Sequence, residues 1–266
     1  MLYPQINPVA FSIGSVDVHW YGLMYLVAFC LGWGLARWRA SRPGSRWTTA
    51  EVDDLVTWIM LGVIVGARLG YVLFYDLPAF AAQPSLIFKL WNGGMSFHGG
   101  LCGVLAACWW WSRRHGRSML DVLDFCAPLV PQGLFFGRIG NFINGELWGG
   151  VTNVPWGMAL AEGLPMRHPS QLYEAFLEGI VLFAVLWIYS ARPRPTGRVA
   201  GLFALLYAIF RSLVEFVRQP DVQLGYLAWG WLTMGQLLCV PLMLAGLWLL
   251  LRPAALPGAP GRRSRH

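Results

Sequence analysis

The chain has 266 residues, of which 56% are hydrophobic and only 12% are charged. A soluble domain carries about 25% charged residues, so this composition excludes an ordinary soluble domain and indicates a membrane protein with several spans. The net charge of +7 does not indicate nucleic-acid binding, because the basic residues lie in short stretches between apolar segments.

Apolar segments occupy most of the chain. A hydrocarbon core about 30 Å thick requires about 20 apolar residues in each helix that crosses it. Seven segments approach this length, and they cover residues 19–38, 53–75, 96–112, 120–138, 171–190, 200–217 and 229–251. The sequence therefore predicts an all-α polytopic membrane protein with seven transmembrane helices, built as a single bundle over residues 1–252.

The distribution of arginines predicts the orientation of this bundle. Basic residues are concentrated in alternate connections, at residues 37–46, 113–117, 192–198 and from 252 onward. The positive-inside rule places these connections in the cytoplasm, so we expect the N-terminus outside and the C-terminus inside. Residues 139–170 then form a small outer cap, and the basic tail 253–266 is expected to be disordered.

Glycines four residues apart allow close helix packing in lipid. Gly62, Gly66 and Gly70 show this spacing in the second segment, and Gly133 and Gly137 show it in the fourth. The alternative is that glycine is simply common in membrane helices.

Three arginines lie within or at the end of apolar segments: Arg68, Arg138 and Arg211. Ionisable residues in such positions are rare, and they face the bundle interior or a wet cavity. With the predicted orientation, all three lie toward the outer leaflet. An arginine fork suits the paired oxygens of a phosphate, so these residues predict an anion site. A structural tie is the alternative for Arg68.

The stretch from Gly137 to Gly149 concentrates polar side chains directly after an apolar run. Asn141 and Asn144 can orient an anion or brace the loop. Glu146 can neutralise an arginine or accept a proton. The alternative is a structural Arg–Glu pair at a helix end.

Tyr207, Arg211 and Glu215 are spaced four residues apart and therefore share one helical stripe. Arg211 and Glu215 are also placed to form a simple ion pair. His98 opens the third segment within a glycine-rich sequence, where a histidine of near-neutral pKa can act as a general base. A structural hydrogen-bond donor is the alternative for His98.

Two further clusters lie at predicted outer helix ends. His19 and Tyr21 open the first segment, where an interfacial aromatic anchor is the alternative to a functional site. Ser170 is expected to cap the fifth helix, and Glu174 to complement the dipole at its start. The sequence has no HExxH, GxSxG or P-loop motif, so we expect no metal and no other cofactor.

The polar stretch resembles the signature of the prolipoprotein diacylglyceryl transferase family. The matching residues are Gly137, Arg138, Asn141, Asn144, Glu146 and Gly149. Other blocks that resemble the family are His19-Trp20-Tyr21-Gly22, His98-Gly99-Gly100, His168-Pro169-Ser170-Gln171 and the stretch from Arg211 to Asp221. These blocks run from the first to the sixth segment, so the resemblance covers most of the chain.

This resemblance implies a multi-pass enzyme of the bacterial inner membrane, with its active site toward the periplasmic leaflet. Such an enzyme transfers the diacylglyceryl group of phosphatidylglycerol to the lipobox cysteine of a preprolipoprotein, forming a thioether and releasing glycerol-1-phosphate. The implied partners are phosphatidylglycerol, the signal-peptide and lipobox region of the preprolipoprotein, and membrane lipids, with no nucleic acid.

The resemblance also implies roles for individual residues. Arg138 and Arg211 hold the phosphate, and His98 or Tyr207 takes the thiol proton. The site is shaped by Tyr21, Asn141, Glu146 and Gly149. We add Arg68 and His19 as substrate-binding candidates.

Two other functions use the same arginines. A carrier or flippase for an anionic lipid or solute binds without changing a bond, and a lipid-binding scaffold only holds the ligand. The inner halves of the segments are largely apolar, which disfavours a carrier because a carrier needs a polar path to both sides.

Overall fold

The computed structural model describes residues 1–253 except 15, 90–92 and 220–224. Two compact units are described separately, the first comprising Met1–Gly32 and Asp124–His266, the second Trp33–Leu123. The expected disordered tail falls almost wholly in residues 254–266, which lie outside the described residues.

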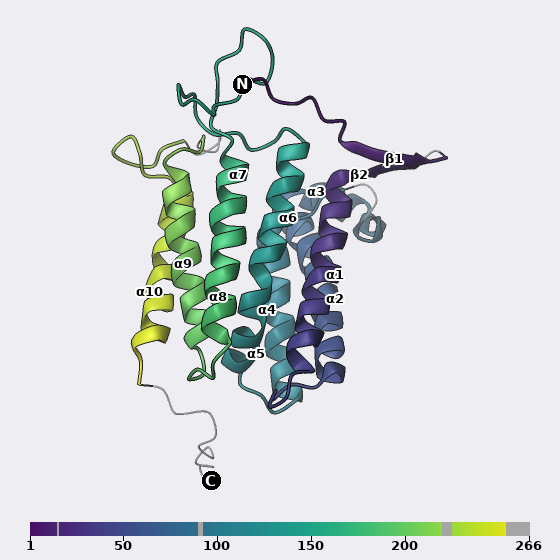
Figure 1. Ribbon diagram of the computed structural model, residues 1–266. Coiled ribbons are helices and arrows are strands. Elements are labelled where there is room, and N and C mark those ends of the chain that lie inside the picture. Colours follow the sequence, from purple (N-terminus) through teal and green to yellow (C-terminus); the bar gives the residue numbers. More distant parts are fainter. Residues whose placement is uncertain (15, 90–92, 220–224, 254–266) are drawn as a thin grey trace. The chain divides into compact units, whose positions relative to one another are not determined.

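Helices dominate the described residues (Figure 1). They include α1 (Trp20–Ala40), α2 (Thr49–Tyr75), α4 (Phe97–Arg114), α5 (Met119–Cys126), α6 (Val130–Ile143), α7 (Ser170–Glu174), α8 (Leu182–Ser190), α9 (Arg198–Glu215) and α10 (Met234–Leu251). Among the described residues, four helical stretches are long and apolar enough to cross a membrane: Thr49–Tyr75, Met119–Ile143, Ser170–Ser190 and Met234–Leu251. The prediction of a mostly helical membrane protein is confirmed, while seven crossings and their orientation stay predictions.

The chain is not purely α-helical. A hairpin of β1 (Val9–Ile13) and β2 (Val16–His19) precedes α1, with Val9 opposite His19 in antiparallel register. Its larger apolar residues recur at Val9, Phe11 and Ile13, which is the two-residue period of a strand. Gly14 has a φ of +61°, which allows the turn. The all-α prediction missed this hairpin because the strands are short.

In the second unit, α2 and α4 approach each other through glycines. A Cβ atom on Gly66 would lie 2.4 Å from the carbonyl oxygen of Gly99, and one on Gly103 would lie 2.0 Å from that of Gly62. The predicted packing role of the glycines in α2 is therefore confirmed. It is wrong for Gly133 and Gly137, because a Cβ at either position would meet nothing within 4 Å.

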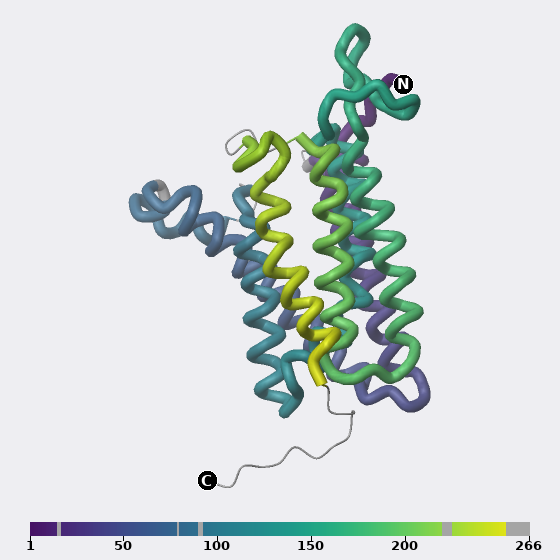
Figure 2. Tube along the Cα trace, turned by 90° about the vertical axis from the view of Figure 1, so that its left-hand side faces the viewer, coloured from purple at the N-terminus to yellow at the C-terminus, as the bar shows by residue number. Residues whose placement is uncertain are grey.

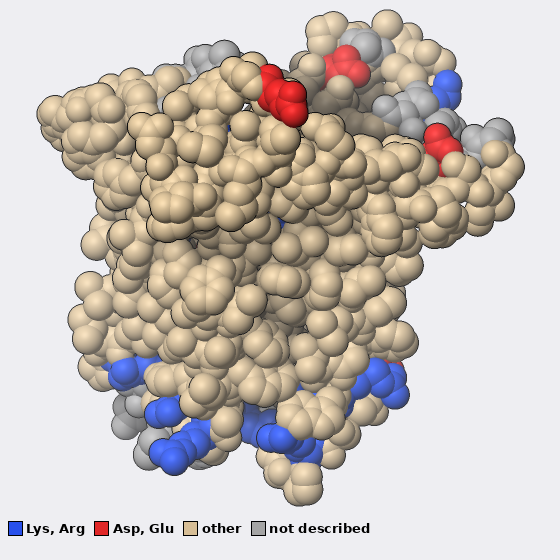
Figure 3. All heavy atoms as spheres, turned by 45° about the horizontal axis from the view of Figure 1, so that its top comes forward, with Lys and Arg blue, Asp and Glu red and all other residues tan. Residues whose placement is uncertain are grey.

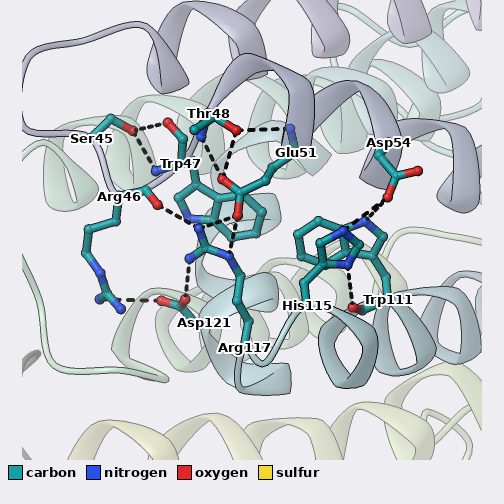
Figure 4. Close-up of polar contacts among 10 residues, drawn as sticks. All are labelled: Ser45, Arg46, Trp47, Thr48, Glu51, Asp54, Trp111, His115, Arg117 and Asp121. Atoms are coloured by element: carbon teal, nitrogen blue, oxygen red, sulfur yellow. Dashed lines mark hydrogen bonds and ion pairs between the residues drawn. The ribbon is translucent and has the colours of Figure 1, made fainter. Parts of the chain in front are cut away.

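A polar cluster ties the start of α2 to the end of α4 and the start of α5 (Figure 4). Thr48 and Glu51 form a capping box, so α2 begins at Thr49 and not at residue 53. Arg117 donates to Glu51 at 2.7 Å and to Asp121 at 3.2 Å. The indole of Trp111 donates to Asp54 at 2.7 Å. Glu51 and Asp121 thus offset the charge of Arg117, which is one of the arginines that define the predicted orientation.

In the first unit, α7 and α8 form one run between α6 and α9 (Figure 1). The π-helix η4 (Ala175–Val181) joins α7 to α8. Helices α9 and α10 lie side by side (Figure 2), with a Cβ on Gly246 only 2.7 Å from the backbone nitrogen of Leu205. Much of the surface drawn in Figure 3 carries neither acidic nor basic side chains, as a surface in contact with lipid requires.

The predicted cap begins later than expected. Helix α6 continues to Ile143, beyond the predicted end at residue 138, so Arg138 and Asn141 lie in its last turns. The segment from residue 144 to 169 contains isolated bridges such as Val151 with Arg167, and Leu2 pairs with Ala159. In the second unit, α2 is followed by α3 (Leu77–Ala82) and η1 (Pro84–Phe88).

Candidate functional site

Arg138 is held by a buried carboxylate from another helix. Its Nε forms an ion pair with Glu174, the last residue of α7. The Glu174 side chain is only 1% exposed, and it also accepts from Arg218 at 3.0 Å. Burying a carboxylate is costly unless it is paired, and two guanidinium groups offset that cost here.

A second carboxylate extends this arrangement along α9. Arg211 and Glu215 form an ion pair at 2.5 Å, as their spacing predicted. Arg218 lies 3.7 Å from the same Glu215, so it links Glu215 with Glu174. Thr233 donates to Glu215 at 2.9 Å. We call Arg138, Glu174, Arg211, Glu215 and Arg218 the arginine–glutamate cluster.

Tyr207 lies one turn before Arg211 on α9 and is partly buried. Its ring stacks on Phe203 with the centroids 5.8 Å apart. The charges of Glu178, Arg211 and Arg138 all act on its hydroxyl group, which places Tyr207 beside the arginine–glutamate cluster.

The signature stretch continues from Arg138 as a chain of polar contacts. Arg138 Nη1 donates to the Asn141 side chain at 3.5 Å. Asn141 and Asn144 both donate to Glu146 at 3.4 Å. The structure gives Glu174, and not Glu146, as the ion-pair partner of Arg138. Asn141 therefore connects Arg138 with Glu146, the carboxylate of the signature stretch.

Gly149 occupies a position that no larger residue fits. Its backbone nitrogen donates to the carbonyl of His168 at 2.9 Å. A Cβ atom there would lie 2.5 Å from the carbonyl oxygen of Val217 and 2.7 Å from the His168 Cβ. The signature glycine thus lets the cap pass between the segment before α7 and the segment after α9.

Two tyrosines brace the last turns of α6. The Tyr3 hydroxyl donates to the carbonyls of Phe142 and Ile143 at 2.7 and 2.9 Å, and burial raises the pKa of this phenol. Tyr21 packs against Gly140, where a Cβ would lie 2.9 Å from the tyrosine ring. His19 ends β2 and is exposed. Tyr3 carried no motif, so the sequence did not single it out.

The segment before α7 is also tied to the signature. Pro169 is the N-cap residue, and the Ser170 hydroxyl donates to the carbonyl of Leu147 at 2.9 Å. Gln171 donates to the carbonyl of Glu146. The prediction that Ser170 caps the N-terminus of this helix is therefore wrong, because its hydroxyl donates to Leu147 instead of accepting from the first turn of the helix. The His168 ring contacts the Tyr173 hydroxyl at 3.1 Å, and burial lowers the pKa of this histidine.

His98 and Arg68 belong to the second unit. His98 is exposed in the first turn of α4, beyond the N-cap Ser96. Arg68 is buried and donates to backbone carbonyls, including those of Ile87 at 3.1 Å and Gly93 at 2.6 Å. These contacts favour the structural role for Arg68. That His98 acts together with the arginine–glutamate cluster stays a prediction.

Three central residues were not among the predicted site residues: Glu174, Glu178 and Arg218. Both glutamates lie within the predicted segment 171–190 and are 0% exposed. The rule that ionisable residues in a span are functional candidates applies to them as much as to the arginines. The helix-dipole explanation of Glu174 was wrong, because its carboxylate pairs with two arginines.

These features define a helical membrane protein with a buried, arginine-rich site suited to an anionic group. The model of the family described as prolipoprotein diacylglyceryl transferase matches residues 8–252, and the chain belongs to this family.

Curated relatives match over nearly the whole chain. The phosphatidylglycerol–prolipoprotein diacylglyceryl transferase of Nitratidesulfovibrio vulgaris strain DP4 is 62% identical over 251 residues, which cover 94% of this chain and 95% of the relative. The protein of the same name from Pseudomonas paraeruginosa strain PA7 is 58% identical over 264 residues, covering 97% and 99%. That of Solidesulfovibrio magneticus strain RS-1 is 59% identical over 257 residues, covering 95% and 97%.

Proposed function

We propose that this protein transfers the diacylglyceryl group of phosphatidylglycerol to the lipobox cysteine of a preprolipoprotein. The products are a thioether-linked lipid and glycerol-1-phosphate. A carbon–sulfur bond forms, and the bond between the diacylglycerol carbon and the phosphate oxygen breaks. The phosphate keeps that oxygen and gains negative charge as it leaves.

The observation that carries this proposal is the buried arginine–glutamate cluster in a member of this family. Arg138 and Arg211 hold the phosphate, and their donors stabilise the charge that develops on the leaving oxygen. The carboxylates of Glu174 and Glu215 orient the two guanidinium groups before the lipid arrives. Preorganised donors of this kind are effective because they need no rearrangement during the reaction.

A base must remove the proton of the acceptor thiol, since the thiolate is the nucleophile. His98 and Tyr207 are the two candidates. Tyr207 lies beside the arginine–glutamate cluster, whereas His98 is exposed at the start of α4. Tyr21, Asn141, Glu146 and Gly149 shape the site around the phosphate, and His19 adds a contact to the substrates.

We place the enzyme in the bacterial inner membrane with seven spans, its N-terminus outside and its C-terminus in the cytoplasm. The supporting feature is the concentration of arginines in alternate connections. The cluster then lies toward the periplasmic leaflet, where the signal peptide of a translocated precursor presents its cysteine. Cysteine labelling at Arg113 and Arg117 in intact cells tests this, because labelling from outside contradicts the orientation.

The test of the reaction combines purified protein, phosphatidylglycerol labelled in its acyl chains, and a lipobox peptide. We expect label on the peptide through a thioether and equimolar glycerol-1-phosphate. A peptide with serine in place of its cysteine is the matched control and stays unlabelled. Folded protein that moves the lipid between leaflets but labels no peptide contradicts the transferase proposal and supports a carrier.

A further inference from the structure

Glu178 is a buried acid that the reaction described above does not use. It lies in the π-helix η4 and is 0% exposed. Among the described residues, neither of its carboxyl oxygens has a hydrogen-bond partner. Buried polar side chains are nearly always hydrogen-bonded, so two unpartnered oxygens on one carboxyl group require an explanation.

The surroundings of Glu178 are those of the arginine–glutamate cluster. Glu174 lies one turn earlier, and the charges of Glu174, Arg138, Arg211 and Arg218 all act on the Glu178 carboxyl group. The ion pairs of these arginines go to Glu174 and Glu215 instead. Glu178 therefore lies beside the proposed phosphate site with its hydrogen-bonding capacity unused.

The local backbone holds Glu178 in this position. A π-helix widens the turn, and such segments occur frequently at functional sites. The next residue, Gly179, lets α6 approach closely, since a Cβ there would lie 2.7 Å from the Phe135 Cβ. This close packing leaves the backbone of η4 little freedom to move Glu178 toward another partner.

The proposed donor lipid carries a group that matches these oxygens. A head group joined to the phosphate lies next to the arginines once the phosphate is bound. The glycerol of phosphatidylglycerol has two hydroxyl groups on adjacent carbons, and the two oxygens of one carboxyl group can accept from both.

We propose that Glu178 binds the glycerol hydroxyl groups of the donor and thereby selects phosphatidylglycerol over phospholipids that lack them. This inference rests on the proposed transferase activity and names the residue that decides head-group specificity. A site built around a substrate hydroxyl rejects an analogue without it, because the polar group of the site is then left unpaired.

The test compares two donors with identical acyl chains. Phosphatidylglycerol and phosphatidylmethanol carry the same phosphodiester charge, but phosphatidylmethanol has no head-group hydroxyl. We expect the wild type to prefer phosphatidylglycerol by at least about 100-fold in kcat/KM. Glu178→Leu is expected to abolish this preference by slowing transfer from phosphatidylglycerol, with transfer from phosphatidylmethanol unchanged.

Glu215→Gln serves as the control, because it disturbs the arginine that holds the phosphate and should slow both donors equally. An equal loss with both donors in Glu178→Leu contradicts the inference and makes Glu178 a structural residue.

If Glu178→Leu does not fold, Glu178→Gln is tested instead, since glutamine keeps the size of the side chain. A reduced preference in that variant supports the inference, and an unchanged preference overturns it. A wild type inactive with both donors refutes the transferase proposal itself.

Discussion

Arg138 on α6 and Glu174 at the end of α7 form an ion pair within the membrane-spanning part of the first unit. The Glu174 side chain is 1% exposed and the Arg138 side chain 19%, so the arginine is the more accessible partner of the pair. Glu174 also binds Arg218. This pairing connects the signature arginine to a helix that lies far from it in the sequence.

Replacing Arg138 by alanine should abolish transfer without unfolding the protein. Glu174 keeps Arg218 as a partner at 3.0 Å, so its buried charge stays compensated. Loss of one donor that stabilises developing charge lowers kcat by about 100-fold to 1,000-fold. Turnover of the labelled lipid and the thermal midpoint in detergent measure the two effects. Wild-type turnover in Arg138→Ala shows that the signature arginine is structural.

Replacing Glu174 by alanine should destabilise the protein. Arg138 loses its buried counter-charge and Arg218 keeps only Glu215 at 3.7 Å, and removing one partner of a buried ion pair costs about 3 kcal/mol or more. Chemical unfolding in detergent measures this loss. The exposed Glu162 in the cap provides the control, since Glu162→Ala should leave the stability unchanged. Equal stability of the two variants means that the arginines find other partners.

Gly149 and Gly150 give a matched pair of alanine substitutions. The added methyl group at Gly149 overlaps the carbonyl of Val217 at 2.5 Å, whereas at Gly150 it meets the same atom at an ordinary 3.9 Å. We expect Gly149→Ala to displace the cap and to lower both stability and transfer. Overpacking of this kind costs roughly 1–3 kcal/mol. Gly150→Ala should behave as the wild type, and similar losses in both variants would argue against the close approach.

Helix packing in the second unit can be tested in the same way. Gly103→Ala places a methyl group 2.0 Å from the carbonyl of Gly62 and should separate α2 from α4, lowering the thermal midpoint. Gly133→Ala meets nothing within 4 Å and should be neutral, or stabilise α6 by up to about 1 kcal/mol. A stable Gly103→Ala variant contradicts the glycine contact between the two helices.

Local rules accounted for some features and missed others. The spacing of Arg211 and Glu215 predicted their ion pair, because residues four apart on a helix are neighbours. The end of α6 was placed too early, since the polar residues after Arg138 suggested a loop. In the structure Asn141 and Glu146 satisfy one another and Tyr3 holds the last carbonyls, so the helix continues into a polar environment.

The sequence by itself determined the helical segments and the family, because a chain in lipid must satisfy its backbone within each segment and the signature residues lie close together in the sequence. It also identified Arg138 and Arg211 as functional candidates, because a charge within an apolar segment is costly. Only the tertiary structure decided the partner of Arg138. Glu174 reaches Arg138 from another helix, and Glu178 one turn later has no hydrogen-bond partner among the described residues, because side-chain contacts depend on how helices pack and not on their order along the chain.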